Sequence, residues 1–514
     1  MENWLNNAVF YEIYPQSFMD TNGDGIGDFQ GIIQKLDYIK EMGFTAIWMN
    51  PCFDSPFYDA GYDIRDFYKV APRYGTNEDL KQLFDEVHKR DMHILLDLVA
   101  GHTSIECEWF NQSKQPEPNR YSHRYIWTDV TWKDFSGVAG VKGSLRGISE
   151  RDGSCAVNYY TVQPALNYGF NQITDANYQL SWQSEPAIDT RNEIINIIEF
   201  WAKLGVDGFR VDMANSLVKN DPNQECTIKL WQQIFEIINK DCPNLKFVSE
   251  WGEPDKALKA GFDMDFLLHF GPSHYNDMYH SNDCYFSGRG SSEEFFKYYN
   301  MVNQQVKENG GYICLPSGNH DMQRLSYYLT DTQIKLVYAF MMAMPGVPFI
   351  YYGDEIGMKY LANTRSKEGG YFRTGARTPM QWDSTKNSGF STAEKTELYL
   401  NMDEDENRPT VEKQMADADS ILNELKKQIE IRKSNACLQE RADFTLINDG
   451  YPLVFKRSLG ESEVLIAINP TDTDQTLPVN ENAQNVIYSF NGTANIRDGV
   501  LTAPALSATY LLIK

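Results

Sequence analysis

The chain has 514 residues, of which 42% are hydrophobic and 23% charged, with a net charge of −24 and a pI of about 4.8. This composition is typical of a globular protein in water, and the length predicts one large domain accompanied by smaller ones. The acidity argues against DNA, RNA and anionic membrane surfaces as partners, and it favours an uncharged or cationic substrate over a sugar phosphate.

Short apolar runs alternate with amphipathic stretches along most of the chain, a pattern that predicts parallel βα units. We expect an α/β fold, a (β/α)8 TIM barrel, because eight such strands occur with helices between them. The expected strands are 9–15, 46–51, 93–99, 208–213, 246–251, 264–270, 312–317 and 348–353. The expected helices are 31–43, 78–91, 193–205, 227–241, 293–306, 331–344 and 420–435.

The alternation breaks in two places. A polar stretch rich in Trp, Tyr, Ser and Gly follows the third strand and is too long for a plain loop, so an inserted subdomain is expected there. Near the C-terminus the pattern changes to short strands, which predicts an antiparallel β-sandwich domain. The predicted division is barrel at 1–102 and 176–438, insertion at 103–175 and C-terminal β domain at 439–514.

The eight cysteines are scattered without a CxxC pair, which in a chain of this length indicates reduced thiols in a cytoplasmic protein. The N-terminal residues show no signal-peptide pattern, and no run of 18 apolar residues occurs. We therefore expect a cytoplasmic protein with no membrane partner.

Carboxylates and histidines stand at the C-terminal ends of the predicted strands, where a barrel carries its active site. Arg210 precedes Asp212 by two residues, so both side chains share one face of the strand and Arg210 can keep Asp212 ionised, as a nucleophile requires. Glu250 needs a raised pKa to act as an acid, which Trp251 and apolar neighbours can supply. The full set is Asp97, His102, Arg210, Asp212, Glu250, His320 and Asp321.

Two carboxylates in these roles, with a third nearby, are what retaining glycoside hydrolysis requires. On the segments DLVAGH, GFRVDMANS, VSEW, SGNHD and QPALNY, the chain resembles glycoside hydrolase family 13, the α-amylase family, over essentially its whole length. YDAGYDIRDFY and GARTPMQWD are similar to segments of the exo-acting α-glucosidases within it, and the resemblance extends to the oligo-1,6-glucosidase and sucrose isomerase group.

The resemblance implies a role for each matched residue. Asp212 would be the nucleophile, Glu250 the general acid/base and Asp321 the carboxylate that grips the sugar hydroxyls. Asp97 would be a structural partner at the base of the site, and His102 and His320 would bind hydroxyls of the same sugar. Arg210 would orient Asp212, Tyr62 would stack under the sugar ring, and Asp59 would pair with Arg377 to close the pocket behind a terminal sugar.

The stretch DTNGDGIGD at 20–28 opens like an EF-hand loop, but its twelfth position is Gly31, where an EF-hand has Glu. It resembles instead the calcium loop of the oligo-1,6-glucosidase group. The resemblance implies a structural Ca²⁺ that takes no part in bond cleavage, and no catalytic cofactor. Its oxygen ligands would be Asp20, Asn22, Asp24, the carbonyl of Ile26, and Asp28.

Three positions depart from the family pattern. Gly101 stands where Asn usually precedes the histidine, so no second calcium site is expected. Ala165 stands where Asp is commoner. Met213 follows the nucleophile and, being long and flexible, would narrow the acceptor side, which leaves the α-1,4 and α-1,6 linkages both open.

The leading hypothesis is a retaining, exo-acting α-glucosidase that releases terminal glucose from short α-glucosides through a covalent glucosyl-enzyme intermediate. The alternative is a transglycosylase or isomerase on the same scaffold, of the sucrose isomerase or trehalose synthase type; an endo-acting α-amylase fits less well because of the closed pocket. A non-catalytic binding or chaperone subunit is disfavoured because all three carboxylates are present. We expect a monomer or homodimer.

Overall fold

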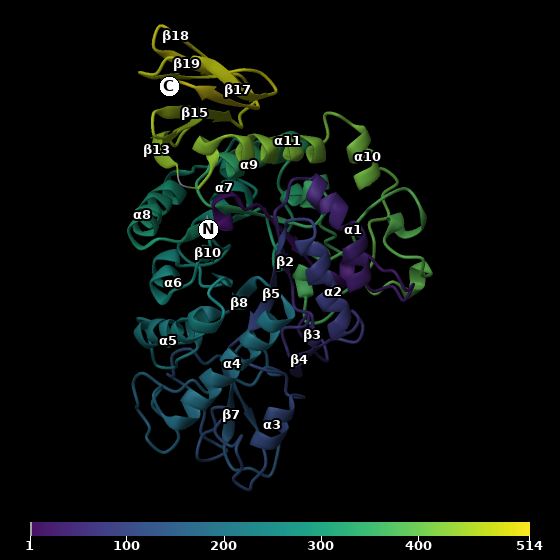
Figure 1. Ribbon diagram of the computed structural model, residues 1–514, viewed down its shortest axis with the longest axis vertical. Helices are drawn as coiled ribbons and strands as arrows, with labels where there is room; N and C mark the ends of the chain where they lie inside the picture. The colour runs from purple at the N-terminus through teal and green to yellow at the C-terminus, as the bar shows by residue number, and fades with distance from the viewer. Residues whose placement is uncertain (1–2, 441) are drawn as a thin grey trace.

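The structure, a computed structural model, describes residues 3–440 and 442–514. Eight parallel strands close into a barrel in the order β1-β12-β11-β10-β9-β8-β5-β2, which confirms the predicted TIM barrel (Figure 1). The strands are β1 (Phe10–Ile13), β2 (Ala46–Met49), β5 (His93–Val99), β8 (Gly208–Asp212), β9 (Lys246–Ser249), β10 (Met264–Phe266), β11 (Tyr312–Pro316) and β12 (Val347–Tyr351).

The barrel strands are almost entirely buried, as strands covered on both faces must be. Large apolar side chains such as Trp48, Leu95, Phe266 and Phe349 form one buried cluster of strand residues. Packing this cluster removes apolar surface from water and keeps the strand ends in fixed positions.

Helices surround the barrel, and several of them begin or end at residues that satisfy their free backbone groups. Asp28 caps α1 by accepting the N–H of Gly31, Thr76 and Asp79 form a capping box on α2, and Gly205 ends α4 in the left-handed conformation. The helices are α1 (Phe29–Glu41), α2 (Asn77–His88), α4 (Glu185–Leu204), α5 (Glu225–Asp241), α6 (Pro254–Ala260), α8 (Glu293–Asn309), α9 (Asp331–Ala343) and α11 (Ile421–Ser434), with the short α7 (Tyr275–Tyr279) and α10 (Val411–Ala416).

Helix α6 was missing from the expected set. Its seven residues make two turns, too few for a hydrophobic period to show in the sequence.

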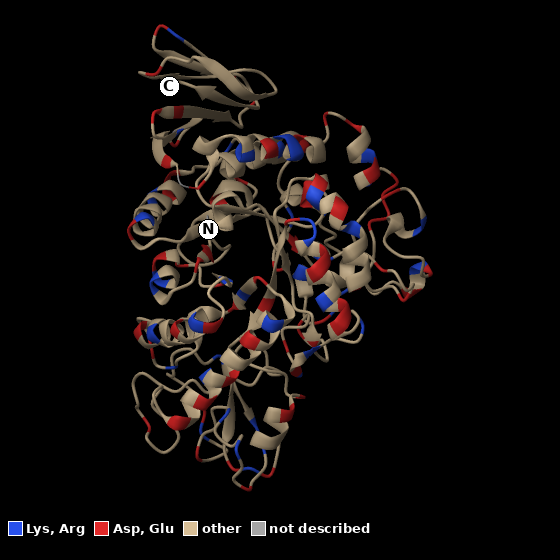
Figure 2. Ribbon diagram, viewed as in Figure 1, with Lys and Arg blue, Asp and Glu red and all other residues tan. Residues whose placement is uncertain are grey.

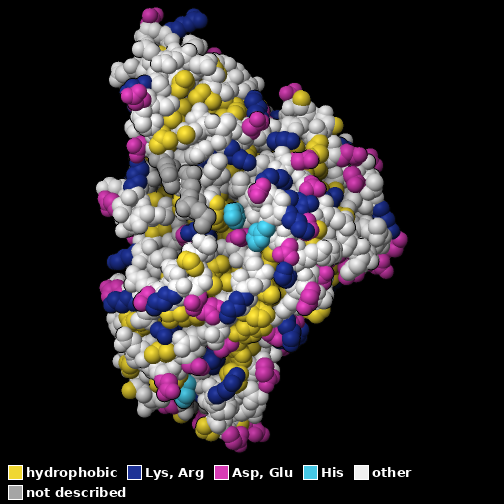
Figure 3. All heavy atoms as spheres, viewed as in Figure 1, with side chains coloured by type: hydrophobic (Ala, Val, Ile, Leu, Met, Phe, Trp, Pro, Cys, Tyr) yellow, Lys and Arg dark blue, Asp and Glu magenta, His cyan; other side chains and the backbone are white. Residues whose placement is uncertain are grey.

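In the part of the chain that the structure describes, no helix combines the length and the apolar composition that crossing a membrane requires. Figure 2 shows acidic and basic residues spread over the outer helices, and Figure 3 shows side chains of both signs interspersed on one face.

The segment between β5 and α4 leaves the barrel pattern. It holds α3 (Glu108–Ser113) and a small sheet of β6 (Gly143–Arg146) and β7 (Ser154–Val157), and it lies at the end of the molecule opposite the C-terminal sheets (Figure 1). An isolated bridge between His102 and Ala165 ties it to the end of β5. A second small sheet, β3 (Phe53–Asp54) with β4 (Asp66–Val70), lies beyond β2. The bounds 103–175 for the insertion stay a prediction.

The C-terminal part is antiparallel, as expected. Five strands pair in the order β13-β14-β15-β20-β17 and three in the order β16-β19-β18. A second sheet agrees with the predicted β-sandwich, but its strands are only three or four residues long and were not individually expected. The strands are β13 (Asp443–Asn448), β14 (Leu453–Leu459), β15 (Ser462–Asn469), β16 (Gln475–Pro478), β17 (Asn485–Phe490), β18 (Asn495–Arg497), β19 (Val500–Ala503) and β20 (Ser507–Leu512).

Candidate active site

A cavity of about 710 Å³ lies where the barrel meets the insertion. Its walls come from segments far apart in the sequence, including the ends of β8 and β9 and the loops after β2, β5 and β11. Among the residues expected at the site, it is lined by Asp59, Tyr62, His102, Asp212, Glu250 and Asp321. Asp97, Arg210, His320 and Arg377 are buried around it without being part of its lining.

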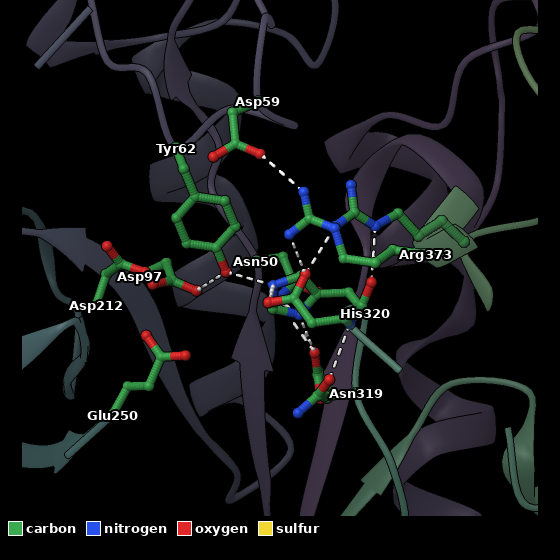
Figure 4. Close-up of polar contacts among 12 residues, drawn as sticks. Asn50, Asp59, Tyr62, Asp97, Asp212, Glu250, Asn319, His320 and Arg373 are labelled. Atoms are coloured by element: carbon green, nitrogen blue, oxygen red, sulfur yellow. Dashed lines mark hydrogen bonds and ion pairs between the residues drawn. The ribbon is translucent and has the colours of Figure 1, made fainter. Parts of the chain in front are cut away.

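Arg210 joins three carboxylates. Its Nη1 lies 2.9 Å from Asp97 Oδ1 and 3.2 Å from Asp212 Oδ1, and its Nη2 lies 3.0 Å from Glu250 Oε2. Asp212 and Glu250 lie near each other on one side of the close-up in Figure 4, with Asp97 beside Asp212. One guanidinium with a fixed fork of donors therefore sets the relative positions of the two candidate catalytic carboxyl groups.

The sequence suggested that Arg210 keeps Asp212 ionised. In the structure, Arg210 does not achieve this by itself. Burial, together with the negative charge of Glu250, raises the pKa of Asp212 well above its usual range, and the charge of Arg210 only opposes this rise. Burial likewise raises the pKa of Asp97 to about 6, again against Arg210. The site therefore favours the protonated form of Asp212 more than water does.

Trp251, expected to raise the pKa of Glu250, has two partners of its own. Its indole packs towards Phe262, with ring centroids 6.3 Å apart, and its Nε1 donates to Gln224 Oε1 at 3.0 Å. Met213, in the left-handed conformation with φ 43°, instead turns its N–H onto Glu250 Oε2 at 3.0 Å. A non-glycine residue held in this region marks a constrained position, and here the constraint places a donor on the candidate acid.

Asp321 is held by two arginines. Nη1 of Arg373 and Nη2 of Arg377 each lie 2.8 Å from its Oδ1. Burial would raise the pKa of Asp321, but the positive charges around it outweigh burial and hold the pKa well below its usual range. His320 is itself buried with a lowered pKa, so the two guanidinium groups supply that charge. Asp321 is therefore ionised.

The expected pair of Asp59 with Arg377 is replaced by another. Asp59 Oδ1 lies 3.3 Å from Nη2 of Arg373, and Asp59 Oδ2 accepts from Gln163 Nε2 at 2.8 Å (Figure 4). Arg377 has other partners, because its Nε donates to the carbonyl of His320 at 2.7 Å and its Nη2 pairs with Asp321. Arg373 lies four residues before Arg377, next to the motif GARTPMQWD. This second arginine was the one feature of the sequence that could have indicated the observed pair.

Tyr62 lies against His320, with ring centroids 5.4 Å apart and planes 14° apart. Its hydroxyl lies 3.0 Å from Asp97 Oδ2 and 2.8 Å from His320 Nε2. The other ring nitrogen of His320 lies 2.9 Å from Glu12 Oε1. Contrary to expectation, His320 thus lies beneath the pocket floor with both nitrogens engaged by protein groups, where it fixes Tyr62 rather than reaching into the cavity.

His102 reaches the cavity wall, but both of its ring nitrogens already form hydrogen bonds within the protein. Its Nε2 lies 3.0 Å from the carbonyl oxygen of Tyr62, to which only an N–H can donate, so Nδ1 is left to accept from Asn158 Nδ2 at 3.0 Å. Burial lowers the pKa of His102 to about 3, so the ring is neutral. Gly101 has a packing reason here, because a Cβ at this position would lie 2.7 Å from the same Asn158 Nδ2.

The loop expected to bind calcium is held by its own backbone. Asp20 accepts the N–H groups of Asn22, Gly23 and Gly25, and its Oδ2 also accepts from Ser391. Asp24 accepts from Ile26 N and Asn22 Nδ2, and Asn22 Oδ1 accepts from Asp24 N. Asp28 caps α1 and binds Thr21.

Over residues 3–440 and 442–514, no three His, Cys, Asp or Glu side chains are grouped so that they could hold a metal ion. Two of the five expected ligands, Asn22 and the carbonyl of Ile26, are not of these types, so the calcium site stays a prediction from the sequence.

Several lining residues were not expected from the sequence. Phe270, Tyr159, Tyr371 and Phe372 line the cavity and are 45 to 66% exposed. His269, Asn158, Asn215 and Lys142 also line it. No motif marks these residues, because they lie in loops whose path depends on the rest of the fold.

Comparisons with known proteins agree with this geometry. The family model for the alpha amylase catalytic domain matches residues 12–441. A glucan 1,6-alpha-glucosidase of Streptococcus pneumoniae is 30% identical over 98% of both chains, and a trehalose-6-phosphate hydrolase of Bacillus subtilis is 29% identical over 92% of this chain and 91% of its own. The solved trehalulose synthase MutB from Pseudomonas mesoacidophila MX-45 superposes with a TM-score of 0.83 at 24% identity over 99% of both chains, a likeness of fold.

Proposed function

The chain belongs to the alpha-amylase family and is a glycoside hydrolase; from this premise we propose that it is a retaining, exo-acting α-glucosidase that removes terminal α-linked glucose from short oligosaccharides. Among its relatives are a glucan 1,6-alpha-glucosidase and oligo-1,6-glucosidases. The observation that carries the proposal is the joint presentation of Asp212 and Glu250 to one cavity, with Arg210 bound to both.

In the proposed reaction, Asp212 is the nucleophile and Glu250 the acid. The Asp212 carboxylate attacks the anomeric carbon as Glu250 gives its proton to the glycosidic oxygen, so the leaving group departs as a neutral alcohol. Water then loses a proton to Glu250 and attacks the same carbon, releasing α-glucose and free Asp212. Burial and the charge of Glu250 raise the pKa of Asp212, so the ionisation of Asp212 sets the acid side of the pH range in which this scheme can run.

The remaining residues divide into those that touch the sugar and those that position them. Asp321, kept ionised by its arginines, would accept hydroxyl hydrogen bonds that strengthen in the transition state, and Tyr62 would stack under the ring. Asp59 and Arg373 would block the cavity behind the terminal sugar, which supports exo action. Arg210, His320 and Arg377 act through Asp212, Tyr62 and Asp321, while His102 shapes the wall.

Transglycosylation or isomerisation is the second candidate function. The exposed aromatic faces of Tyr159, Phe270, Tyr371 and Phe372 at the cavity can hold a second sugar where water would otherwise enter. The covalent intermediate is the same in both reactions, and the outcome depends on whether water or a sugar attacks it.

We also propose a cytoplasmic location, which the eight free thiols support, and small α-glucosides as substrates. No catalytic cofactor is needed for the scheme above. If Ca²⁺ binds at Asp20–Asp28, it would stabilise that loop without touching the reacting sugar. A monomer or homodimer remains our expectation.

The test is a proton-NMR time course with maltose, maltotriose, isomaltose and sucrose offered separately. Early release of the α-anomer of glucose establishes a retaining exo-glucosidase, and the initial rates rank the linkages. New disaccharide signals with little free glucose show that the enzyme transfers glucose to sugars. Early release of β-glucose contradicts the retaining scheme.

A further inference from the structure

Strand β10 carries a carboxyl group that the proposed reaction does not use. Asp265 is 0% exposed and lies between Met264 and Phe266, which both belong to the buried apolar cluster of strand residues. Because successive side chains of a strand point to opposite faces, Asp265 points out of the barrel, to the face that helix α6 covers (Figure 1). Burying a carboxyl group there is costly unless its oxygens are hydrogen-bonded, so its partners show what it does.

The partners of Asp265 are the two residues on either side of Glu250. Its Oδ1 accepts from Ser249 Oγ at 2.6 Å and from Trp251 N at 3.0 Å. The register of the sheet explains these contacts, because Asp265 is paired with Ser249 where β10 runs beside β9. Strand β9 ends at Ser249, so Trp251 lies beyond the strand and its N–H is bound by a side chain. One carboxyl oxygen therefore spans the position of Glu250.

The main chain of Glu250 is thus held from both neighbouring strands. Its own N–H donates to the carbonyl of Val211 in β8 at 2.9 Å, and the residues that flank it bind Asp265 in β10. The carboxyl group of Glu250 lines the cavity, where Met213 N donates to its Oε2 at 3.0 Å. Asp265 does not line the cavity, so its effect on the reaction must pass through Glu250.

The electrostatics of Asp265 show which property of the side chain the fold uses. Burial raises the pKa of Asp265 well above its usual range, against the hydrogen bonds from Ser249 and Trp251. Among the described residues, its Oδ2 has no hydrogen-bond partner. The feature that matters is therefore a single acceptor oxygen, Oδ1, which an asparagine can also present.

We propose that Asp265 is a positioning residue for the candidate general acid/base Glu250, which it fixes by holding the main chain on both sides of it. The proposal deepens the proposed function and rests on it for the role of Glu250. Proton transfer requires a donor within about 2.6–3.2 Å of its acceptor, and a displacement of about 1 Å can cost on the order of 10²-fold in rate. A residue that never touches the sugar can therefore control this step.

The test measures kcat/KM on two aryl α-glucosides, one with phenol and one with 2,4-dinitrophenol as the leaving group. In the first chemical step, phenol needs the proton of Glu250 and dinitrophenol does not. Asp265→Ala removes the acceptor, so it should lower the value for the phenyl glucoside about tenfold more than the value for the dinitrophenyl glucoside. Asp265→Asn keeps Oδ1 and should behave like the natural enzyme.

Asp263→Ala is the matched control. Asp263 binds the other end of β9, where it accepts from Phe247 N at 2.9 Å and pairs with Lys246 at 2.8 Å. This variant should lower the melting temperature without any dependence on the leaving group. Ser249→Ala removes one of the two hydrogen bonds of Asp265 and should show a smaller effect of the same kind. It replaces Asp265→Ala as the test if that variant does not fold.

Equal losses on both aryl glucosides, or no loss on either, would overturn the proposal. So would an Asp265→Asn variant as impaired as Asp265→Ala, or a leaving-group dependence in Asp263→Ala. Crystal structures of the variants need no turnover: the Glu250 carboxyl group should move in Asp265→Ala and stay in place in Asp263→Ala. A chain inactive on every glucoside in which Glu250 moves in this way would contradict the glucosidase and keep the positioning by Asp265, whereas an unmoved Glu250 would contradict the positioning.

Discussion

Asp59 and Arg373 form a largely buried ion pair in the cavity wall, with Asp59 Oδ1 3.3 Å from Arg373 Nη2, and the same guanidinium holds Asp321 at 2.8 Å. One arginine thus joins the residue that closes the pocket to the carboxylate proposed to grip the sugar. Any change at Arg373 should alter both the shape of the pocket and the position of Asp321.

We predict that Arg373→Ala lowers kcat/KM for short α-glucosides and reduces the preference for terminal glucose. Removing one partner of a buried pair leaves an uncompensated charge and costs roughly 3–5 kcal/mol. The measurement is kcat/KM on maltose and on a longer maltooligosaccharide, with Asp59→Ala and the double variant completing a cycle. Strictly additive effects would show that Asp59 and Arg373 do not act together.

The assignment of nucleophile and acid predicts different behaviour for two variants. Asp212→Ala should abolish turnover, and added formate or azide should restore it in part by taking the place of the carboxylate. Glu250→Gln should lose roughly 10²–10⁴-fold on substrates with poor leaving groups and much less on nitrophenyl glucosides, which need little protonation. Turnover that survives in Asp212→Ala without an added anion would contradict the assignment.

The raised pKa of Asp212 predicts the pH profile. Asp212 must be ionised to attack, and an ordinary aspartate has a pKa of about 4. The acid limb of kcat/KM should therefore lie at a higher pH than that. Above about pH 6, where Asp97 is ionised, its negative charge raises the pKa of Asp212 further. Asp97→Asn should therefore move the acid limb to lower pH, on the order of one pH unit. A shift to higher pH would be opposite to this electrostatic account.

Gly101 offers a test of packing. Gly101→Ala would bring a Cβ within 2.7 Å of Asn158 Nδ2, so either Asn158 leaves His102 or the wall moves. We expect a loss of about 1–3 kcal/mol in unfolding free energy, measured by urea denaturation. Gly450→Ala is the control, since an added Cβ there meets nothing closer than 3.5 Å. Equal stability of the two variants would mean that Asn158 adjusts freely.

Chelation tests the predicted calcium site. The pattern at Asp20–Asp28 predicts that Ca²⁺ raises the melting temperature, because a ligand bound only to the folded state stabilises it. Activity at 25 °C should stay unchanged after EDTA treatment. Asp24→Asn should abolish the calcium effect. A melting temperature identical in EDTA and in excess Ca²⁺ would show that hydrogen bonds alone hold the loop.

The sequence by itself determined the barrel, the antiparallel C-terminal sheets and the motif residues at the strand ends. Strand periodicity and the rule that barrel chemistry lies at the C-terminal ends are local properties, and they led directly to Asp212, Glu250 and Asp321. The short helix α6 and the small strands β16, β18 and β19 escaped this reasoning because a period needs more residues to show.

Only the tertiary structure decided which charged groups meet. Arg373 pairs with Asp59, while Arg377 pairs with Asp321 and donates to the carbonyl of His320. Both sets of contacts depend on how the loop after β12 folds back over the barrel. Likewise the raised pKa of Asp212 and the contacts of Asp265 arise from burial and from neighbours distant in sequence. The free energy of a charge depends on everything around it in space, so no stretch of sequence contains it.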